Sequence, residues 1–265
     1  MRYLFGDLEK IKRSLKGKLL FLFLDCDGTL APIADTPAKA VIPLDTKILL
    51  GLLSRKDNCR IAIISGRALA DIKKRVGLRN IIYSGNHGFQ IEGPKIKHEM
   101  AISASYKEAL RRIKAHLKEK LSGIKGVFVE DKLLSLALHF RLADERSVPF
   151  IKTVFHESII FYSARNKIRV GSGKKILEVR PPARWDKGRV VLWLLARQKI
   201  ISRKKKIFPV YLGDDTTDED AFKALRGKGL TVFVGKPSNS GAAYYLKSPK
   251  EVTRFLGWVS GLKYN

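Results

Sequence analysis

The sequence contains only two cysteines among 265 residues, and this scarcity excludes a fold held together by disulfide bonds. It also lacks any run close to the ~18 consecutive apolar residues that a membrane-spanning helix needs. The longest apolar runs are Leu19–Leu24 and Val190–Ala196. The first follows basic residues, as in a secretory signal, but it is short and continues into Asp25 without a small-residue cleavage site. We therefore expect a soluble, cytoplasmic protein.

Acidic residues are scarce relative to basic ones. Lys and Arg number 52 against 25 Asp and Glu, which gives a formal net charge of +27. This balance favours anionic partners such as phosphorylated metabolites, nucleic acid or acidic membrane surfaces, but a lysine-rich proteome would produce it equally well. The densest basic run, Arg203–Lys206, is predicted to be a solvated loop, and no aromatic residues interleave with it as a nucleic-acid stacking platform requires. Nucleic acid is therefore not an expected partner, and neither is a membrane.

The apolar content of 45% is enough for a sizeable core, and the length favours about two domains. Several short apolar runs end in small or polar residues, with helical patterns between them. Strands buried on both faces read in this way, so the pattern predicts an α/β fold with a doubly wound, mostly parallel sheet. Strands are expected at 19–24, 60–64, 81–83, 210–212 and 230–234, and helices at 46–53, 68–76, 188–198 and 219–225.

The middle of the chain shows a different order of predicted elements. A helix is expected over 106–121, with Leu110, Ile113, Leu117 and Leu121 on one stripe, and strands follow at 127–130 and 133–140. A second helix at 147–158 and strands at 167–170 and 175–179 repeat this order. The repeat predicts an inserted α+β domain over residues 89–182, within a core domain formed by residues 1–88 and 183–265.

The sharpest motif is Asp25-Cys26-Asp27-Gly28-Thr29, directly after a predicted buried strand. Residues i and i+2 of a strand share a face, so Asp25 and Asp27 can point into one crevice. One carboxylate can then act as a nucleophile and the other as general acid and base. Asp and Gly also form ordinary turns, but this combination rarely arises by chance. Asp25 and Asp27 are therefore predicted catalytic residues.

Two further segments offer groups that suit a phosphate. Ser65-Gly66-Arg67 ends a predicted strand and opens a helix, where a hydroxyl and free backbone N–H groups can bind an anion. Ser65 could equally be an ordinary N-cap. Lys187 precedes the apolar helix and could neutralise a phosphoryl group and a nearby carboxylate, although a surface lysine would look the same.

A second strong signal is the acidic segment at 213–220, which contains Asp214 and Asp215 straight after a predicted strand. Carboxylate oxygens suit Mg²⁺, so these two residues are predicted to hold the metal. Glu219 and Asp220 are expected to favour the helix dipole instead. Together with Asp25, Asp27, Ser65 and Lys187, these parts predict phosphoryl transfer through an aspartyl phosphate.

These segments resemble the four motifs of the haloacid dehalogenase phosphohydrolase superfamily; the matching residues are Asp25–Thr29, Ser65, Lys187 and Gly213–Asp215. The resemblance implies a doubly wound core with a mobile cap formed by the insert. It also implies that Mg²⁺ is held by the Asp25 carboxylate, the Asp27 backbone carbonyl and the Asp214 carboxylate, with Asp215 in support.

Further segments resemble the trehalose-6-phosphate phosphatase family; they lie at 85–88, 129–132, 139–141, 177–181, 185–188 and 211–222. The resemblance implies that the protein hydrolyses trehalose 6-phosphate. A separate synthase chain is expected to supply that substrate. The resemblance also implies substrate contacts from the following residues: Ser65, Gly66, Arg67, Asn86, His87, Glu130, Lys132, Arg141, Glu178 and Lys187. Phe140 departs from the family, which more often has Tyr there.

Several alternatives remain open from the sequence. The substrate could be another sugar phosphate, such as sucrose 6-phosphate or mannosyl-3-phosphoglycerate, or the enzyme could be a phosphohexomutase. Glu130, Lys132 and Glu178 favour trehalose 6-phosphate. A different class is a basic nucleic-acid-binding or scaffold protein on a disused fold, which the intact catalytic motifs argue against. A monomer is the favoured oligomeric state.

Overall fold

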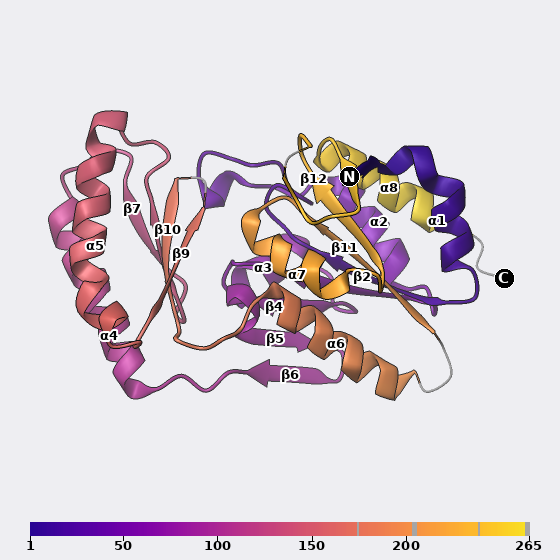
Figure 1. Ribbon diagram of the computed structural model, residues 1–265, viewed down its shortest axis with the longest axis horizontal. Helices are drawn as coiled ribbons and strands as arrows, with labels where there is room; N and C mark the ends of the chain where they lie inside the picture. Colours follow the sequence, from indigo (N-terminus) through magenta and orange to yellow (C-terminus); the bar gives the residue numbers. More distant parts are fainter. Residues whose placement is uncertain (174, 203–205, 238, 263–265) are drawn as a thin grey trace. The chain divides into compact units, whose positions relative to one another are not determined.

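The computed structural model describes residues 1–173, 175–202, 206–237 and 239–262. It divides into two compact units (Figure 1). The core unit comprises Met1–Ala34, Ala38–His98 and Trp185–Asn265, and the inserted unit comprises Asp35–Pro37 and Glu99–Arg184. Residues 89–98, which the sequence analysis assigned to the insert, belong to the core unit, and residues 183–184 belong to the inserted unit. The basic segment 203–205 lies outside the described residues.

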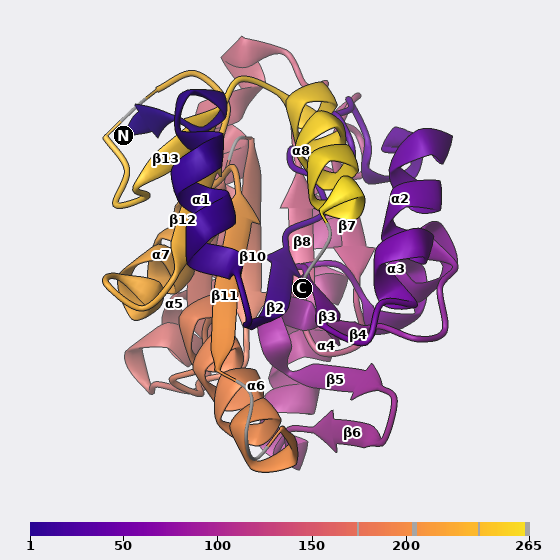
Figure 2. The ribbon, with the colours of Figure 1, turned by 90° about the vertical axis from the view of Figure 1, so that its right-hand side faces the viewer.

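A nine-strand sheet runs through the described part of the core unit, in the order β1-β13-β12-β11-β2-β3-β4-β5-β6. In this spatial order, each strand from β1 through β13, β12, β11, β2 and β3 to β4 is parallel to the next one, and β5 is antiparallel to β4 (Figure 2). The strands are β1 (Arg2–Tyr3), β2 (Leu19–Leu24), β3 (Cys59–Ile64), β4 (Ile82–Gly85), β5 (Gln90–Gly93), β6 (Ile96–Glu99), β11 (Ile207–Gly213), β12 (Leu230–Val234) and β13 (Tyr244–Leu246). This topology confirms the predicted doubly wound, mostly parallel α/β fold.

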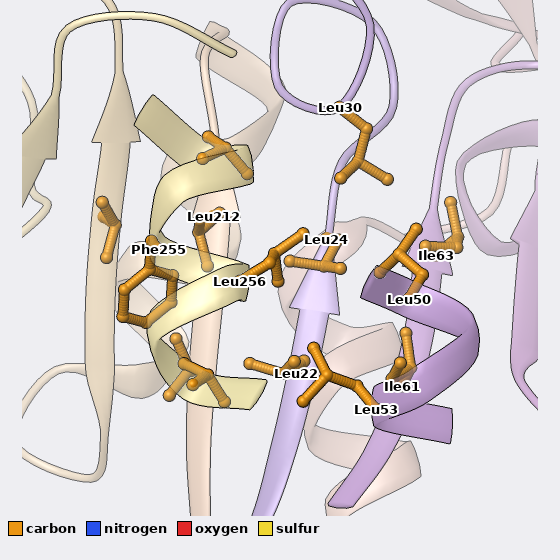
Figure 3. Close-up of a cluster of buried hydrophobic side chains, with 14 of the residues drawn as sticks. Leu22, Leu24, Leu30, Leu50, Leu53, Ile61, Ile63, Leu212, Phe255 and Leu256 are labelled. Carbon is orange, nitrogen blue, oxygen red and sulfur yellow. The ribbon is translucent and has the colours of Figure 1, made fainter. Parts of the chain in front are cut away.

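Helices cover both faces of this sheet because its central strands are apolar on both sides. Along β2, Leu22 and Leu24 face the layer formed by α1 (Leu8–Leu15), α2 (Leu44–Ser54), α3 (Leu69–Val76) and α8 (Pro249–Gly261). Figure 3 shows leucines of α2 and α8 against these β2 side chains. Phe21 and Phe23 of β2 face α6 (Lys187–Ile201) and α7 (Glu219–Leu225) on the other side. Each buried leucine or phenylalanine contributes about 1.5–3 kcal/mol, so β2 is fixed at the centre.

The inserted unit is a four-strand antiparallel sheet with two helices on one face, within the described residues. The strands occur in the order β7 (Phe128–Asp131), β8 (Leu136–His139), β10 (Ile176–Arg180) and β9 (Arg169–Gly173). The helices are α4 (Ala104–Leu121) and α5 (Val148–Ala164). The predicted stripe of α4 is confirmed: Leu110, Ile113, Leu117 and Leu121 are buried against Leu136, Leu138 and Val179 of the sheet.

The remaining short elements are 3-10 turns: η1 (Leu4–Asp7), η2 (Pro37–Lys39), η3 (Asn86–Gly88), η4 (Glu145–Ser147) and η5 (Thr216–Asp218). Two of them, η3 and η5, follow strands of the core sheet and shape the loops described below. In the part of the chain that the structure describes, no helix combines the length and apolar character needed to cross a membrane.

Candidate active site

The carboxyl ends of β2 and β11 bring two acidic segments to the same edge of the core sheet. Leu24 of β2 is in register with Leu212 of β11, and the ladder continues to Asp25, whose backbone N–H donates to the Leu212 carbonyl at 3.0 Å. Asp25 therefore follows β2 and Asp214 follows β11, at the same edge of the sheet. Polar residues at this edge of an open α/β sheet commonly form the ligand site.

Lys187 joins these segments through a buried ion triad. Its Nζ donates to Asp25 Oδ1 at 2.7 Å and to Asp218 Oδ1 at 2.8 Å, and all three side chains are buried. Lys187 begins α6, where Asp186 caps the helix by accepting a hydrogen bond from the Arg189 N–H. The first residue of α6 therefore contacts two carboxylates, of Asp25 and Asp218, that are far apart in the sequence.

Burial and charge act against each other in this triad. Burial opposes the charged form of Lys187, but the Asp218 and Asp25 carboxylates outweigh it and hold the lysine pKa well above its usual value. Burial raises the pKa of the Asp25 carboxyl, while the Lys187 ammonium works in the opposite direction. The ammonium is therefore a fixed positive charge beside Asp25, as a site for a phosphoryl group requires.

Asp218 is a site residue that the sequence analysis did not single out. It is fully buried and accepts four hydrogen bonds, from Lys187 Nζ, from Tyr211 OH at 2.6 Å and from the backbone N–H groups of Asp214 and Asp215 at 3.0 Å. Burial is the main reason that the Tyr211 pKa is raised, so the phenol keeps its proton as a donor. The signal was available: Asp218 stands four residues after Asp214, where η5 turns its carboxylate back to the loop.

Three carboxylates could hold a metal ion within the described part of the chain. Asp25, Asp214 and Asp218 each place one oxygen within 4.8 Å of the others. Hard oxygen donors of this kind fit Mg²⁺. Asp218 already accepts four hydrogen bonds, which is about the capacity of a carboxylate, so Asp25 and Asp214 are the better ligands.

A glycine is required at position 28, beside the Asp214 carboxylate. Its φ of 85° lies in the left-handed region, and a Cβ there would overlap the Asp214 carboxylate. The close approach of the two loops therefore depends on Gly28.

Asp215 has a different environment from its neighbour. Its Oδ1 accepts hydrogen bonds from the Thr217 N–H at 2.5 Å and from Thr216 Oγ1 at 3.2 Å, so it caps η5. Burial alone would raise the pKa of Asp215, but Lys187 and these hydrogen bonds lower it. Glu219 also makes a structural contact, since its Oε2 accepts the Gly241 N–H at 2.8 Å.

Asp27 is held by Arg67 rather than by the triad. Arg67 Nε and Nη2 donate to the two Asp27 carboxylate oxygens, each at 2.6 Å. Arg67 also donates to Asp71 at 2.7 Å, and Asp71 accepts from Arg75 at 2.8 Å. The arginine side chain is 7% exposed and that of Asp27 is 40% exposed, so a buried guanidinium fixes a carboxylate that solvent can still reach.

The segment 65–67 is tied to the turn at 86–87. The His87 N–H donates to the Ser65 carbonyl at 3.0 Å, and the Asn86 N–H donates to the Arg67 carbonyl at 2.7 Å. Asn86 and His87 both adopt left-handed φ values, of 50° and 55°, which costs about 1 kcal/mol or more per residue. The His87 ring lies so close to Gly66 that a Cβ there would overlap it. Four predicted substrate residues (Ser65, Gly66, Asn86 and His87) thus lie together.

The inserted unit brings its own predicted residues together. Glu130 of β7 and Glu178 of β10 are both in register with Ala137 of β8, so they share a sheet face. Lys132 Nζ lies 2.7 Å from Glu178 Oε1 and 4.0 Å from Glu130 Oε2. These three groups form one ionic cluster.

The sequence analysis missed two members of that cluster. His139 Nε2 lies 2.8 Å from Glu130 Oε2, and Arg180 Nε donates to Glu178 Oε2 at 3.0 Å. His139 precedes the predicted Arg141, which lies beyond the end of β8. Phe140 is buried in the apolar core of this unit, so the ring at this position has a packing role.

Comparisons with known proteins identify the family. Residues 23–250 match the model of the family described as trehalose-phosphatase. The chain belongs to the trehalose-phosphatase family. That match spans both units, from the end of β2 to the start of α8.

Individual members of the trehalose-phosphatase family support this assignment. Trehalose-phosphate phosphatase B of Arabidopsis thaliana is 35% identical over 94% of this chain and 68% of its own length. Trehalose-phosphate phosphatase of Mycobacterium marinum is 36% identical over 89% of this chain, which corresponds to 60% of its own length. The solved C-terminal domain of a C. albicans trehalose-6-phosphate phosphatase is 27% identical, with a TM-score of 0.80 over 99% of this chain and 98% of that one.

We predict that Lys187→Met lowers the free energy of unfolding by about 3–5 kcal/mol, because it leaves Asp25 and Asp218 buried without their cation. Urea unfolding in metal-free buffer measures the loss. Lys199→Met is the matched control, since it changes an exposed lysine of the same helix and should cost about 0.5 kcal/mol or less. Equal losses in the two variants would show that the triad contributes nothing particular to stability.

Proposed function

We propose that this chain is a Mg²⁺-dependent phosphatase that hydrolyses trehalose 6-phosphate to trehalose and inorganic phosphate. The observation that carries the proposal is the buried Asp25–Lys187–Asp218 triad beside Asp214, in a chain of the trehalose-phosphatase family. The triad supplies a carboxylate that can attack phosphorus and a cation that can bind the phosphoryl oxygens.

The reaction follows two displacements at phosphorus. An oxygen of the Asp25 carboxylate attacks the phosphoryl group while the sugar oxygen leaves and takes a proton from Asp27. Asp27 then accepts a proton from water as the water oxygen attacks the aspartyl phosphate, which releases inorganic phosphate and restores Asp25. Mg²⁺, held by Asp25, Asp214 and the Asp27 backbone carbonyl, would offset the negative charge of the phosphoryl group and of the carboxylates around it. Asp215 would support that site through the loop that it caps.

Arg67 bears on the two roles of Asp27. The bidentate contact of the Arg67 guanidinium holds the two Asp27 carboxylate oxygens in one orientation. The Asp27 side chain is 40% exposed, so it stays accessible to the leaving oxygen and to the water of the second displacement.

Substrate recognition is proposed to be divided between the units. Ser65, Gly66 and Lys187 would bind the phosphoryl group, and Arg67, Asn86 and His87 would support that segment.

The inserted unit would act as the cap that selects the sugar. Its cluster of Glu130, Lys132 and Glu178 offers charged acceptors and a donor, which suit the hydroxyls of a disaccharide, with Arg141 close by in the chain.

The first experiment measures phosphate release from trehalose 6-phosphate with and without Mg²⁺. We predict metal-dependent release that falls by about 10⁴-fold or more in Asp25→Asn, because the nucleophile is lost. Asp45→Asn, which changes an exposed acid of α2, is the control and should retain activity. Unchanged turnover in Asp25→Asn would contradict the mechanism, whereas turnover of sucrose 6-phosphate or mannosyl-3-phosphoglycerate in place of trehalose 6-phosphate would change the substrate.

A second prediction separates the sugar-binding cluster from the chemistry. Lys132→Ala should lower kcat/KM for trehalose 6-phosphate by about 10–100-fold, because the ammonium loses its contacts with sugar hydroxyls, and should change p-nitrophenyl phosphate turnover by less than about threefold. Glu178→Gln should show the same split while keeping the side-chain shape. Lys152→Ala, on the exposed surface of α5, serves as the control. An equal loss on both substrates would remove the cluster from the sugar site.

A further inference from the structure

A second set of cations gathers at the opposite edge of the core sheet. A cavity of about 580 Å³ lies there, which we call the basic hollow. The described residues that line it are Lys18, Lys199, Lys206, Ile207, Phe208, Gly227, Lys228 and Gly229. Lys18 immediately precedes β2, Lys206 precedes β11, and Gly229 precedes β12, so the hollow lies at the amino ends of these strands.

The basic hollow is separate from the candidate active site. Asp25 and Asp214 follow the carboxyl ends of β2 and β11, whereas Lys18 and Lys206 stand at the other ends. A strand rises about 3.3 Å per residue, so the length of β2 alone separates the two edges by about 20 Å. The phosphoryl group attacked by Asp25 cannot reach these lysines.

The positive charge of the basic hollow has no acid to offset it among the described residues that line it. Lys18 Nζ lies 5.3 Å from the centre of the Phe208 ring, and Lys228 Nζ donates to the Ala224 carbonyl at 3.3 Å. Both of these partners are neutral. Like charges on residues that line one cavity repel each other, and a bound anion would relieve that repulsion.

The size and walls of the basic hollow indicate the kind of anion. Small-molecule sites commonly measure about 300–1,000 Å³, and 580 Å³ falls inside that range. Lysine ammonium groups bind phosphate as point charges. Ile207 and the half-buried Phe208 ring add an apolar wall that a sugar or base could contact.

We propose that the basic hollow binds a small metabolite carrying two or more phosphoryl groups. In the described part of the chain, four lysines line the basic hollow, and their formal charge matches the several negative charges of such a ligand better than it matches the charge of a single phosphate ester. Binding of single-stranded nucleic acid instead favours a groove with several aromatic side chains, and Phe208 is the one aromatic residue among the described residues that line this cavity. The proposal concerns a binding site distinct from catalysis and stands whether or not the proposed function holds.

Pyrophosphate titration in metal-free buffer tests the proposal. The backbone amide NMR signals of Gly227 and Gly229 report occupancy of the basic hollow directly, so binding elsewhere is distinguished. We expect saturable shifts of these signals, and we expect Lys18→Ser/Lys206→Ser/Lys228→Ser to weaken the affinity by about tenfold or more.

The control variant is Lys107→Ser/Lys152→Ser/Lys250→Ser, which removes the same formal charge from the exposed surfaces of α4, α5 and α8. It should retain most of the pyrophosphate affinity. Equal weakening in both triple variants, or unshifted Gly227 and Gly229 signals, would overturn the proposal. A short DNA duplex that binds more tightly than pyrophosphate and shifts the same signals would assign the hollow to nucleic acid and would overturn it as well.

Discussion

The structure depends most on the buried contact of the Lys187 ammonium with the Asp25 and Asp218 carboxylates. This contact joins the end of β2, the start of α6 and the loop after β11, three segments that the sequence keeps far apart. Removing one partner from a buried ion pair commonly costs about 3–5 kcal/mol, so the cation and the acids hold one another in place. The same contact places a positive charge beside the proposed nucleophile, and thus stability and chemistry share one interaction.

The sheet determines where that contact can form. Because β2 and β11 are parallel and in register, their following residues meet at one edge, and Gly28 permits the loops to approach closely. Asp218 then fixes the second loop through two backbone N–H groups. Most of the site is therefore preorganised by backbone and buried side chains, whereas Asp27 is positioned by an arginine from a third loop. Membership of the trehalose-phosphatase family agrees with this construction.

Much of the fold could be predicted from the sequence because burial on both faces leaves a plain signal. The central strands and four core helices read directly as apolar runs and amphipathic patterns, as Leu19–Leu24 illustrates. Six of the described strands and α-helices were not predicted: the short strands β1, β5, β6 and β13 and the helices α1 and α8. The strands have too few residues to show a clear period, and the two helices lie outside the segments that carry the motifs. The end of the insert was placed near residue 182, close to Arg184, but its start was placed before β5 and β6, which pair with the core sheet.

The candidate site was predictable where chemistry is local in sequence, and less so where it is long-range. Asp25 and Asp214 follow from strand ends and residue type, whereas Lys187 could be predicted only in combination with the other motifs. The acceptance of four hydrogen bonds by Asp218 depends on how η5 turns back. The contact between Asp27 and Arg67 and the shared register of Glu130 and Glu178 depend on tertiary pairing, which sequence periodicity does not encode.

The most direct test of the proposed nucleophile is acid quench of Asp27→Asn with p-nitrophenyl phosphate, followed by mass spectrometry. The leaving group of this substrate needs no proton from residue 27, so the first displacement proceeds and the second is blocked. We expect one phosphoryl group on the peptide containing Asp25; a phosphoryl group on any other residue, or turnover without a phosphoenzyme, would show that Asp25 is not the nucleophile.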